Sequence, residues 1–120
     1  MTEDNEKKKR IAHKGDWKTK PMPEENETFV FNRTFSDEEI YKLSCGHIPK
    51  DMNDRWFSYM EKSTLFLHRS WTGYCVYKLY FKEDNNHLVV VNRDFKQYNC
   101  NSIEKDTKSL NRLLDYLIKD

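Results

Sequence analysis

The sequence predicts an α+β domain, in which an antiparallel β-sheet of about five strands is packed by a C-terminal amphipathic helix. Segments rich in β-branched and aromatic residues follow one another across short polar turns between residues 55 and 93, which is typical of neighbouring antiparallel strands. Leucine and isoleucine then recur at helical spacing between residues 110 and 118, with charged residues between them. Because an apolar sheet face has to be covered, we expect this helix to lie across the sheet.

The composition fits one small domain with part of the chain unpacked. The length of 120 residues suits a single domain, and 34% of the residues are charged against 37% hydrophobic. Residues 1–26 carry many charges and few large apolar side chains, and the stretch ends in two prolines. We therefore expect a disordered charged N-terminal arm over 1–26 and a single α+β domain over 27–120. The basic run Lys7–Arg10 can contact phosphates or an acidic partner, with a solubilising tail as the alternative.

The charge balance argues against a general nucleic-acid-binding protein, and the short apolar runs argue against a membrane-spanning one. Lysine and arginine number 21 against 20 aspartate and glutamate, a net charge of +1, so the sequence has no excess positive charge for binding nucleic acid generally. No apolar run is long enough to span a membrane, and no signal peptide follows Met1, so a cytoplasmic location is expected. The odd number of cysteines, Cys45, Cys75 and Cys100, predicts free thiols.

The first strand and the first helix have the clearest local signals. Residues 28–35 alternate well enough for a strand. Ser36 and Glu39 are spaced as a capping box that opens a helix, and Gly46 is a natural stop. Further strands are expected at 55–60, 64–71, 74–81 and 87–93, and the final helix is expected to begin near residue 101 or 102.

Side chains that can bind a ligand by charge, hydrogen bonding or stacking are most concentrated around residues 67–74. Arg69 offers a planar donor fork suited to a carboxylate or phosphate, and Trp71 and Tyr74 offer flat faces on which a base can stack. Strand alternation places His68 and Ser70 on one face and Arg69 and Trp71 on the other. The predicted ligand-binding residues are Arg55, His68, Arg69, Ser70, Trp71, Thr72 and Tyr74.

The alternative interpretation is that these side chains are structural. Trp56, Trp71 and the tyrosines would then fill the core, and Arg69 would pair with Asp54 or Glu61. Polar side chains grouped with the aromatics favour a binding site, because burying polar groups without partners is costly.

Neither a metal site nor a catalytic group is predicted, and no cofactor is expected. The segment Cys45–His47 matches no zinc spacing even when His68, Cys75 or Cys100 is added. Cys75 lies among apolar residues, which is typical of an inert thiol rather than a nucleophile activated by His68.

Four short motifs between residues 31 and 81 carry a resemblance. They read SDEEI at 36–40, GHIP at 46–49, MNDRWF at 52–57 and HRSWTG at 68–73. This half of the chain resembles a little-characterised bacterial small domain found alongside macrodomains and ADP-ribosylglycohydrolases. The resemblance implies a ligand of the ADP-ribose or NAD type, or a partner that acts on one, and it carries over no catalytic residue.

Three functions follow as hypotheses. The first is a non-catalytic binding module for a nucleotide-like or phosphorylated ligand, in bacterial defence or counter-defence. The second is a protein–protein inhibitor or adaptor of a bacterial defence system. The third is a hydrolase or transferase on ADP-ribose linkages, with His68 as the acid or base. The expected partner is thus a nucleotide-like small molecule or a protein, with no specific nucleic acid and no membrane, and the oligomeric state is left open.

Overall fold

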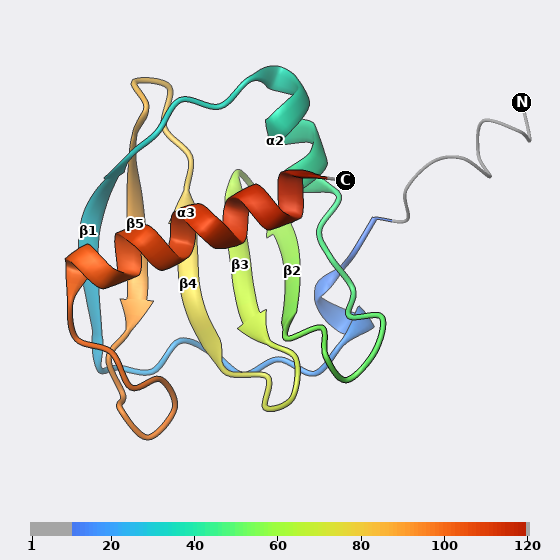
Figure 1. The fold of residues 1–120 in the computed structure, drawn as a ribbon, viewed down its shortest axis with the longest axis vertical. Helices are drawn as coiled ribbons and strands as arrows, with labels where there is room; N and C mark the ends of the chain where they lie inside the picture. The colour runs from blue at the N-terminus through green and yellow to red at the C-terminus, as the bar shows by residue number, and fades with distance from the viewer. Residues whose placement is uncertain (1–10, 120) are drawn as a thin grey trace, which may run out of the picture.

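The fold is a five-stranded antiparallel sheet with a long helix across one face, which confirms the predicted α+β class (Figure 1). The structure is a computed structural model that describes residues 11–119. Its elements are η1 (Lys14–Asp16), β1 (Asn26–Asn32), α2 (Asp37–Ser44), β2 (Trp56–Glu61), β3 (Thr64–Arg69), β4 (Cys75–Tyr80), β5 (Asn86–Asn92) and α3 (Ile103–Lys119).

The strands are ordered β1-β5-β4-β3-β2, so β2 to β5 form a meander and β1 pairs with the last strand. Phe29 of β1 lies opposite Val89 of β5, and Phe31 lies opposite His87. The connection from β1 carries α2 past one end of the sheet before β2 begins at the other edge (Figure 1).

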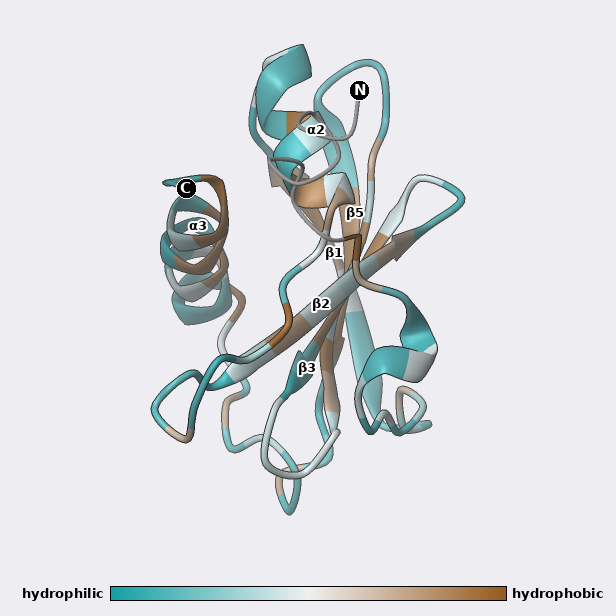
Figure 2. Cartoon of the chain, turned by 90° about the vertical axis from the view of Figure 1, so that its right-hand side faces the viewer, coloured by the Kyte–Doolittle hydropathy of each residue, from teal (hydrophilic) through white to brown (hydrophobic). Residues whose placement is uncertain are grey.

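Helix α3 buries its apolar stripe against the sheet. Leu110 and Leu114 are fully buried in the same cluster as Phe31, Leu67 and Leu79. Figure 2 shows the hydrophobic side of α3 turned toward the strands. This packing is what a 3.6-residue apolar period requires of a helix that covers a sheet. In the part of the chain that the structure describes, no helix has the length and apolarity to cross a membrane.

Helix α2 begins with the predicted capping box. The Glu39 amide donates to Ser36 Oγ at 3.1 Å, and the Ser36 amide donates to Glu39 Oε1 at 3.0 Å. Gly46 follows the helix with φ +74°, and a Cβ built on it would lie 2.5 Å from the Ser58 carbonyl oxygen. Glycine is therefore required where the chain turns toward β2.

A buried carboxylate joins the start of α3 to the sheet. Asp106 is 0% exposed, and its Oδ1 accepts hydrogen bonds from Tyr98 at 2.7 Å and from Tyr77 at 3.2 Å. Its Oδ2 lies 2.8 Å from Arg93 Nη1, and Arg93 Nε donates to Glu27. Burial opposes the charge of Arg93, but its bonds to Glu27 and Asp106 outweigh that effect and raise its pKa. The network holds β1, β4, the loop after β5 and α3 together.

The segment before β1, residues 11–25, is docked on the sheet, whereas the sequence predicts a disordered arm over 1–26. Ala12 is 2% exposed, and its amide donates to the Cys45 carbonyl at 2.7 Å. Trp17 stacks on Phe57 with ring centroids 6.4 Å apart, and its indole N–H donates to the Ser70 carbonyl at 2.7 Å. This segment lies on the face opposite α3 (Figure 2). A few well-placed apolar contacts and backbone hydrogen bonds order it despite its charge. The basic run Lys7–Arg10 lies outside the described residues.

Replacing the buried carboxylate should destabilise the whole domain. Asp106→Asn removes the charge that offsets Arg93, so we expect a loss of about 3 kcal/mol in the free energy of unfolding by urea. Glu104→Gln, on the exposed first turn of α3, is the matched control and should change stability by less than about 0.5 kcal/mol. If Asp106→Asn lowers the free energy of unfolding no more than Glu104→Gln does, the buried network does not stabilise the domain.

Removing the indole of Trp17 should release the segment before β1. Trp17→Ala loses the stack on Phe57 and the hydrogen bond to Ser70, and we expect a cost of about 2 kcal/mol in unfolding free energy, below a fully buried tryptophan. Trypsin should then cleave after Lys18 faster than in the wild type, as followed by mass spectrometry. Ile11→Ala, at an exposed position, should leave the cleavage rates unchanged. Rapid cleavage of the wild type after Lys18 would mean that the segment is not docked.

Candidate functional site

A hollow of about 440 Å³ opens at the end of the sheet where β3 turns into β4. Its lining residues are Arg55, Arg69, Trp71, Thr72, Tyr74, Lys96 and Gln97. We call it the arginine hollow. It contains five of the seven predicted ligand-binding residues, together with two from the loop after β5.

The turn between β3 and β4 fixes the backbone of this site. The Gly73 amide donates to the Arg69 carbonyl at 2.8 Å, and the Arg69 amide donates to the Tyr74 carbonyl at 2.9 Å. Gly73 has φ +82°, which favours glycine. The register places Arg69 opposite Trp56, so Arg55, just before β2, lies beside the same turn.

Arg69 is held by an aromatic stack and not by a carboxylate. Its guanidinium carbon lies 4.9 Å from the centroid of the Trp56 ring. Trp56 in turn stacks on Tyr77, with centroids 6.3 Å apart and planes at 22°. Such a contact orients a guanidinium while leaving its N–H groups free to donate. The alternative in which Arg69 pairs with Asp54 or Glu61 is wrong, because Arg69 has no ion pair within residues 11–119.

The hollow has an excess of positive charge. Arg55, Arg69 and Lys96 form no ion pair with any acidic side chain among the described residues. The adjacent Asp54 is already bound, with both carboxylate oxygens 2.8 Å from His47 Nε2. Asp94 accepts a hydrogen bond from the Lys96 amide at 3.1 Å. Three cations around one concave surface create a potential that favours an anion.

Trp71 gives the hollow a flat apolar wall. Its side chain is 63% exposed, yet its indole N–H donates to the Met52 carbonyl at 3.0 Å, which fixes the ring. Tyr74 is half-buried on the same hollow. Exposed rings that are held in place are suited to stacking on a planar ligand.

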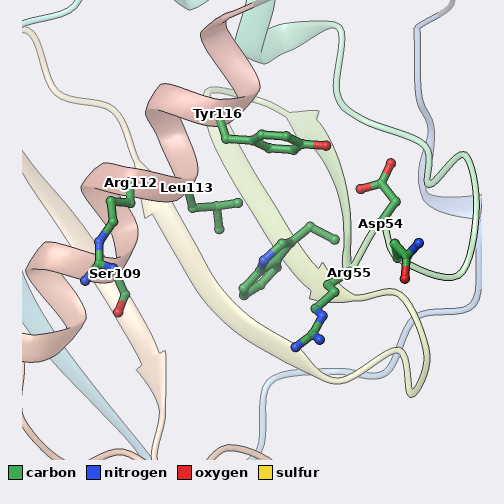
Figure 3. Close-up of a pocket in the computed structure, with 8 residues that line it drawn as sticks. Asp54, Arg55, Ser109, Arg112, Leu113 and Tyr116 are labelled. Carbon is green, nitrogen blue, oxygen red and sulfur yellow. The ribbon is translucent and has the colours of Figure 1, made fainter.

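A second hollow of about 420 Å³ adjoins the first and shares Arg55 with it (Figure 3). It lies between the segment before β2 and helix α3, which contributes Ser109, Arg112 and Tyr116 (Figure 3). Arg112 is exposed and has no acidic partner in the described part of the chain. The cationic surface therefore continues from the arginine hollow onto α3.

The structure places His68 and Ser70 away from the arginine hollow. Both are 2% exposed, and neither lines it. Ser70 Oγ donates to the Asp54 carbonyl at 2.8 Å, which ties the segment before β2 to the turn. The His68 ring stacks on Tyr59, on the sheet face that carries the segment before β1. The structure thus brings five of the seven predicted residues together at the arginine hollow and places His68 and Ser70 elsewhere.

Two of the three cysteines, Cys45 and Cys75, are buried free thiols. Burial raises the pKa of Cys75 to about 12, so its thiol stays protonated near neutral pH. Residues 11–119 contain no group of three or more histidine, cysteine or acidic side chains placed to hold a metal ion.

Sequence reasoning missed Lys96 and Gln97, and it missed Arg112. Lys96 and Gln97 lie in a polar stretch without periodicity, and only the pairing of β4 with β5 brings that stretch to the turn after β3. Arg112 occupies the polar side of an amphipathic helix, where charged residues are ordinarily solvated.

Comparisons of this chain with protein-family models, with curated proteins and with solved structures found no match. The resemblance to the bacterial small domain therefore stays a prediction, and the case for a function depends on the geometry of the site.

Proposed function

We propose that this chain is a non-catalytic binding module for a nucleotide-like or phosphorylated ligand of the ADP-ribose or NAD type. One observation carries the proposal: Arg55, Arg69 and Lys96 surround a hollow without any carboxylate partner in the described chain, beside the exposed ring of Trp71. Cations that the fold does not neutralise are available to an external anion.

The dimensions and chemistry of the hollow suit such a ligand. A diphosphate would accept hydrogen bonds from Arg55 and Arg69, whose guanidinium groups have forked N–H donors. A base would stack on Trp71 or Tyr74, and Thr72 and Gln97 would bind ribose hydroxyls. The volume of about 440 Å³ is within the range of small-molecule sites.

Binding is favoured over turnover by the nature of the lining residues. Arginine, lysine, tryptophan, threonine, tyrosine and glutamine line the hollow, so no carboxylate, imidazole or thiol faces a ligand there. The hydrolase or transferase hypothesis needs His68 as acid or base, and His68 lies elsewhere.

A second candidate function, the protein inhibitor or adaptor, is favoured by exposed apolar side chains near the same hollow. Met52 is 74%, Trp71 63% and Phe95 72% exposed, and Met52 is hydrogen-bonded to Trp71 through its backbone. Tryptophan and arginine together are typical of the residues that dominate protein interfaces. A partner with an acidic, apolar surface would suit this composition, in the bacterial defence setting that the resemblance implies.

Titration calorimetry with ADP-ribose, NAD, AMP and adenosine tests the first proposal. We expect binding of the phosphorylated ligands, with Arg69→Gln weakening it at least about tenfold because one forked pair is lost. Lys62→Gln, at the exposed β2–β3 turn, is the control and should bind like the wild type. Affinity should fall as salt is added.

Two outcomes would argue against a nucleotide-binding module. The absence of heat with all four ligands would contradict the nucleotide-binding proposal. A stoichiometric protein complex that Trp71→Ala abolishes and Arg69→Gln only weakens would support the adaptor instead.

A further inference from the structure

A separate hollow of about 390 Å³ lies on the opposite face of the sheet, beneath the segment before β1. We call it the lysine hollow, and its polar lining includes Lys14, Thr19, Lys20, His68 and Lys78. Lys14 and Lys20 come from the docked N-terminal segment, whereas His68 and Lys78 belong to β3 and β4. It shares no residue with the arginine hollow.

His68 has one nitrogen bound and one free. Its Nδ1 lies 2.9 Å from the Gly73 carbonyl oxygen, which can only accept, so Nδ1 carries the hydrogen. In the neutral ring Nε2 is then an acceptor, and this buried atom has no hydrogen-bond partner in residues 11–119. The ring is held by Tyr59, with centroids 5.6 Å apart and planes at 14°. A buried polar atom without a partner is costly, so this position favours a ligand that supplies a donor.

The surroundings of His68 are positive or neutral. Lys14, Lys20 and Lys78 have no acidic partner among the residues that the structure describes. Lys78 Nζ lies 5.6 Å from the centroid of the Phe66 ring, which holds the ammonium over the sheet.

The two other titratable groups near His68 are uncharged near neutral pH. The pKa of Tyr59 is raised to about 12, mainly by burial, and burial raises that of Cys75 to about 12 as well. Burial, with smaller effects of Lys14 and Lys78, lowers the pKa of His68 itself despite its bond to Gly73. The neutral acceptor His68 Nε2 therefore lies near three lysines that have no acidic partner in the described chain.

We propose that the lysine hollow binds an oxyanion that carries its own acidic proton, with the O–H donating to His68 Nε2 and the negative charge lying among Lys14, Lys20 and Lys78. Monohydrogen phosphate is the simplest such anion near neutral pH. Sulfate has the same shape but no proton, so it can bind in this way only after His68 is protonated. The diphosphate of ADP-ribose also lacks an acidic proton near neutral pH, so this site is distinct in its chemistry from the arginine hollow.

The experiment is a titration of the ¹⁵N-labelled protein with inorganic phosphate and with sulfate, monitored through the ring signals of His68. Near neutral pH we expect saturable shifts with phosphate and at least about tenfold weaker binding of sulfate at equal ionic strength. The gap should narrow only as the pH falls through the lowered pKa of His68, because protonated His68 can donate to sulfate. Lys78→Gln and Lys20→Gln should each weaken phosphate binding about tenfold, and Lys62→Gln should not.

Three results would overturn the proposal. These are equal binding of the two anions near neutral pH, His68 signals that respond to neither anion, and lysine variants that bind phosphate like the wild type. The outcome is separable from that of the proposed function, because Lys20 and Lys78 do not line the arginine hollow, so Lys20→Gln and Lys78→Gln should bind ADP-ribose like the wild type.

Discussion

The buried carboxylate of Asp106 is the constraint on which the positions of the functional side chains depend. It accepts hydrogen bonds from Tyr77 and Tyr98 and pairs with Arg93, so it fixes the start of α3 and the loop after β5. The ring of Tyr77 then supports Trp56, which supports the guanidinium of Arg69. The same network thus orients Arg69 through Tyr77 and Trp56. Through the loop that holds Tyr98, it also places Lys96 beside Arg69.

The net charge of +1 conceals an uneven distribution of charge. Acidic side chains are used within the fold: Glu39 caps α2, Asp54 binds His47, and Asp115 pairs with Arg33. Six cations line hollows on both faces of the sheet, with Arg55, Arg69 and Lys96 in one and Lys14, Lys20 and Lys78 in the other. Concave surfaces lined by cations that have no acidic partner in the described chain are suited to anions, whichever face is considered.

Local signals predicted much of the fold, and they failed where distant segments meet. The Ser36–Glu39 capping box and the leucine spacing of α3 needed only neighbouring residues. The docking of Trp17 could not be predicted, because one indole decides it by reaching Phe57 and Ser70 across the sheet. The alternation of side chains along the strand places His68 and Arg69 on opposite faces of the sheet. The predicted site nevertheless included both, because they are neighbours in the sequence. Lys96 was missed because only the β4–β5 pairing brings it to the site.

The guanidinium groups of Arg55 and Arg69 have no acidic partner in the described chain, and we propose that an external anion binds them. Nuclear magnetic resonance of the arginine Nε–H groups tests it most directly. In the free protein the Arg69 Nε–H signal should exchange readily with solvent, and saturating ADP-ribose should shift it and slow its exchange, with Arg33 unchanged in its pair with Asp115. An Arg69 signal that is already protected without ligand, or that does not respond to a ligand that binds, would contradict the account.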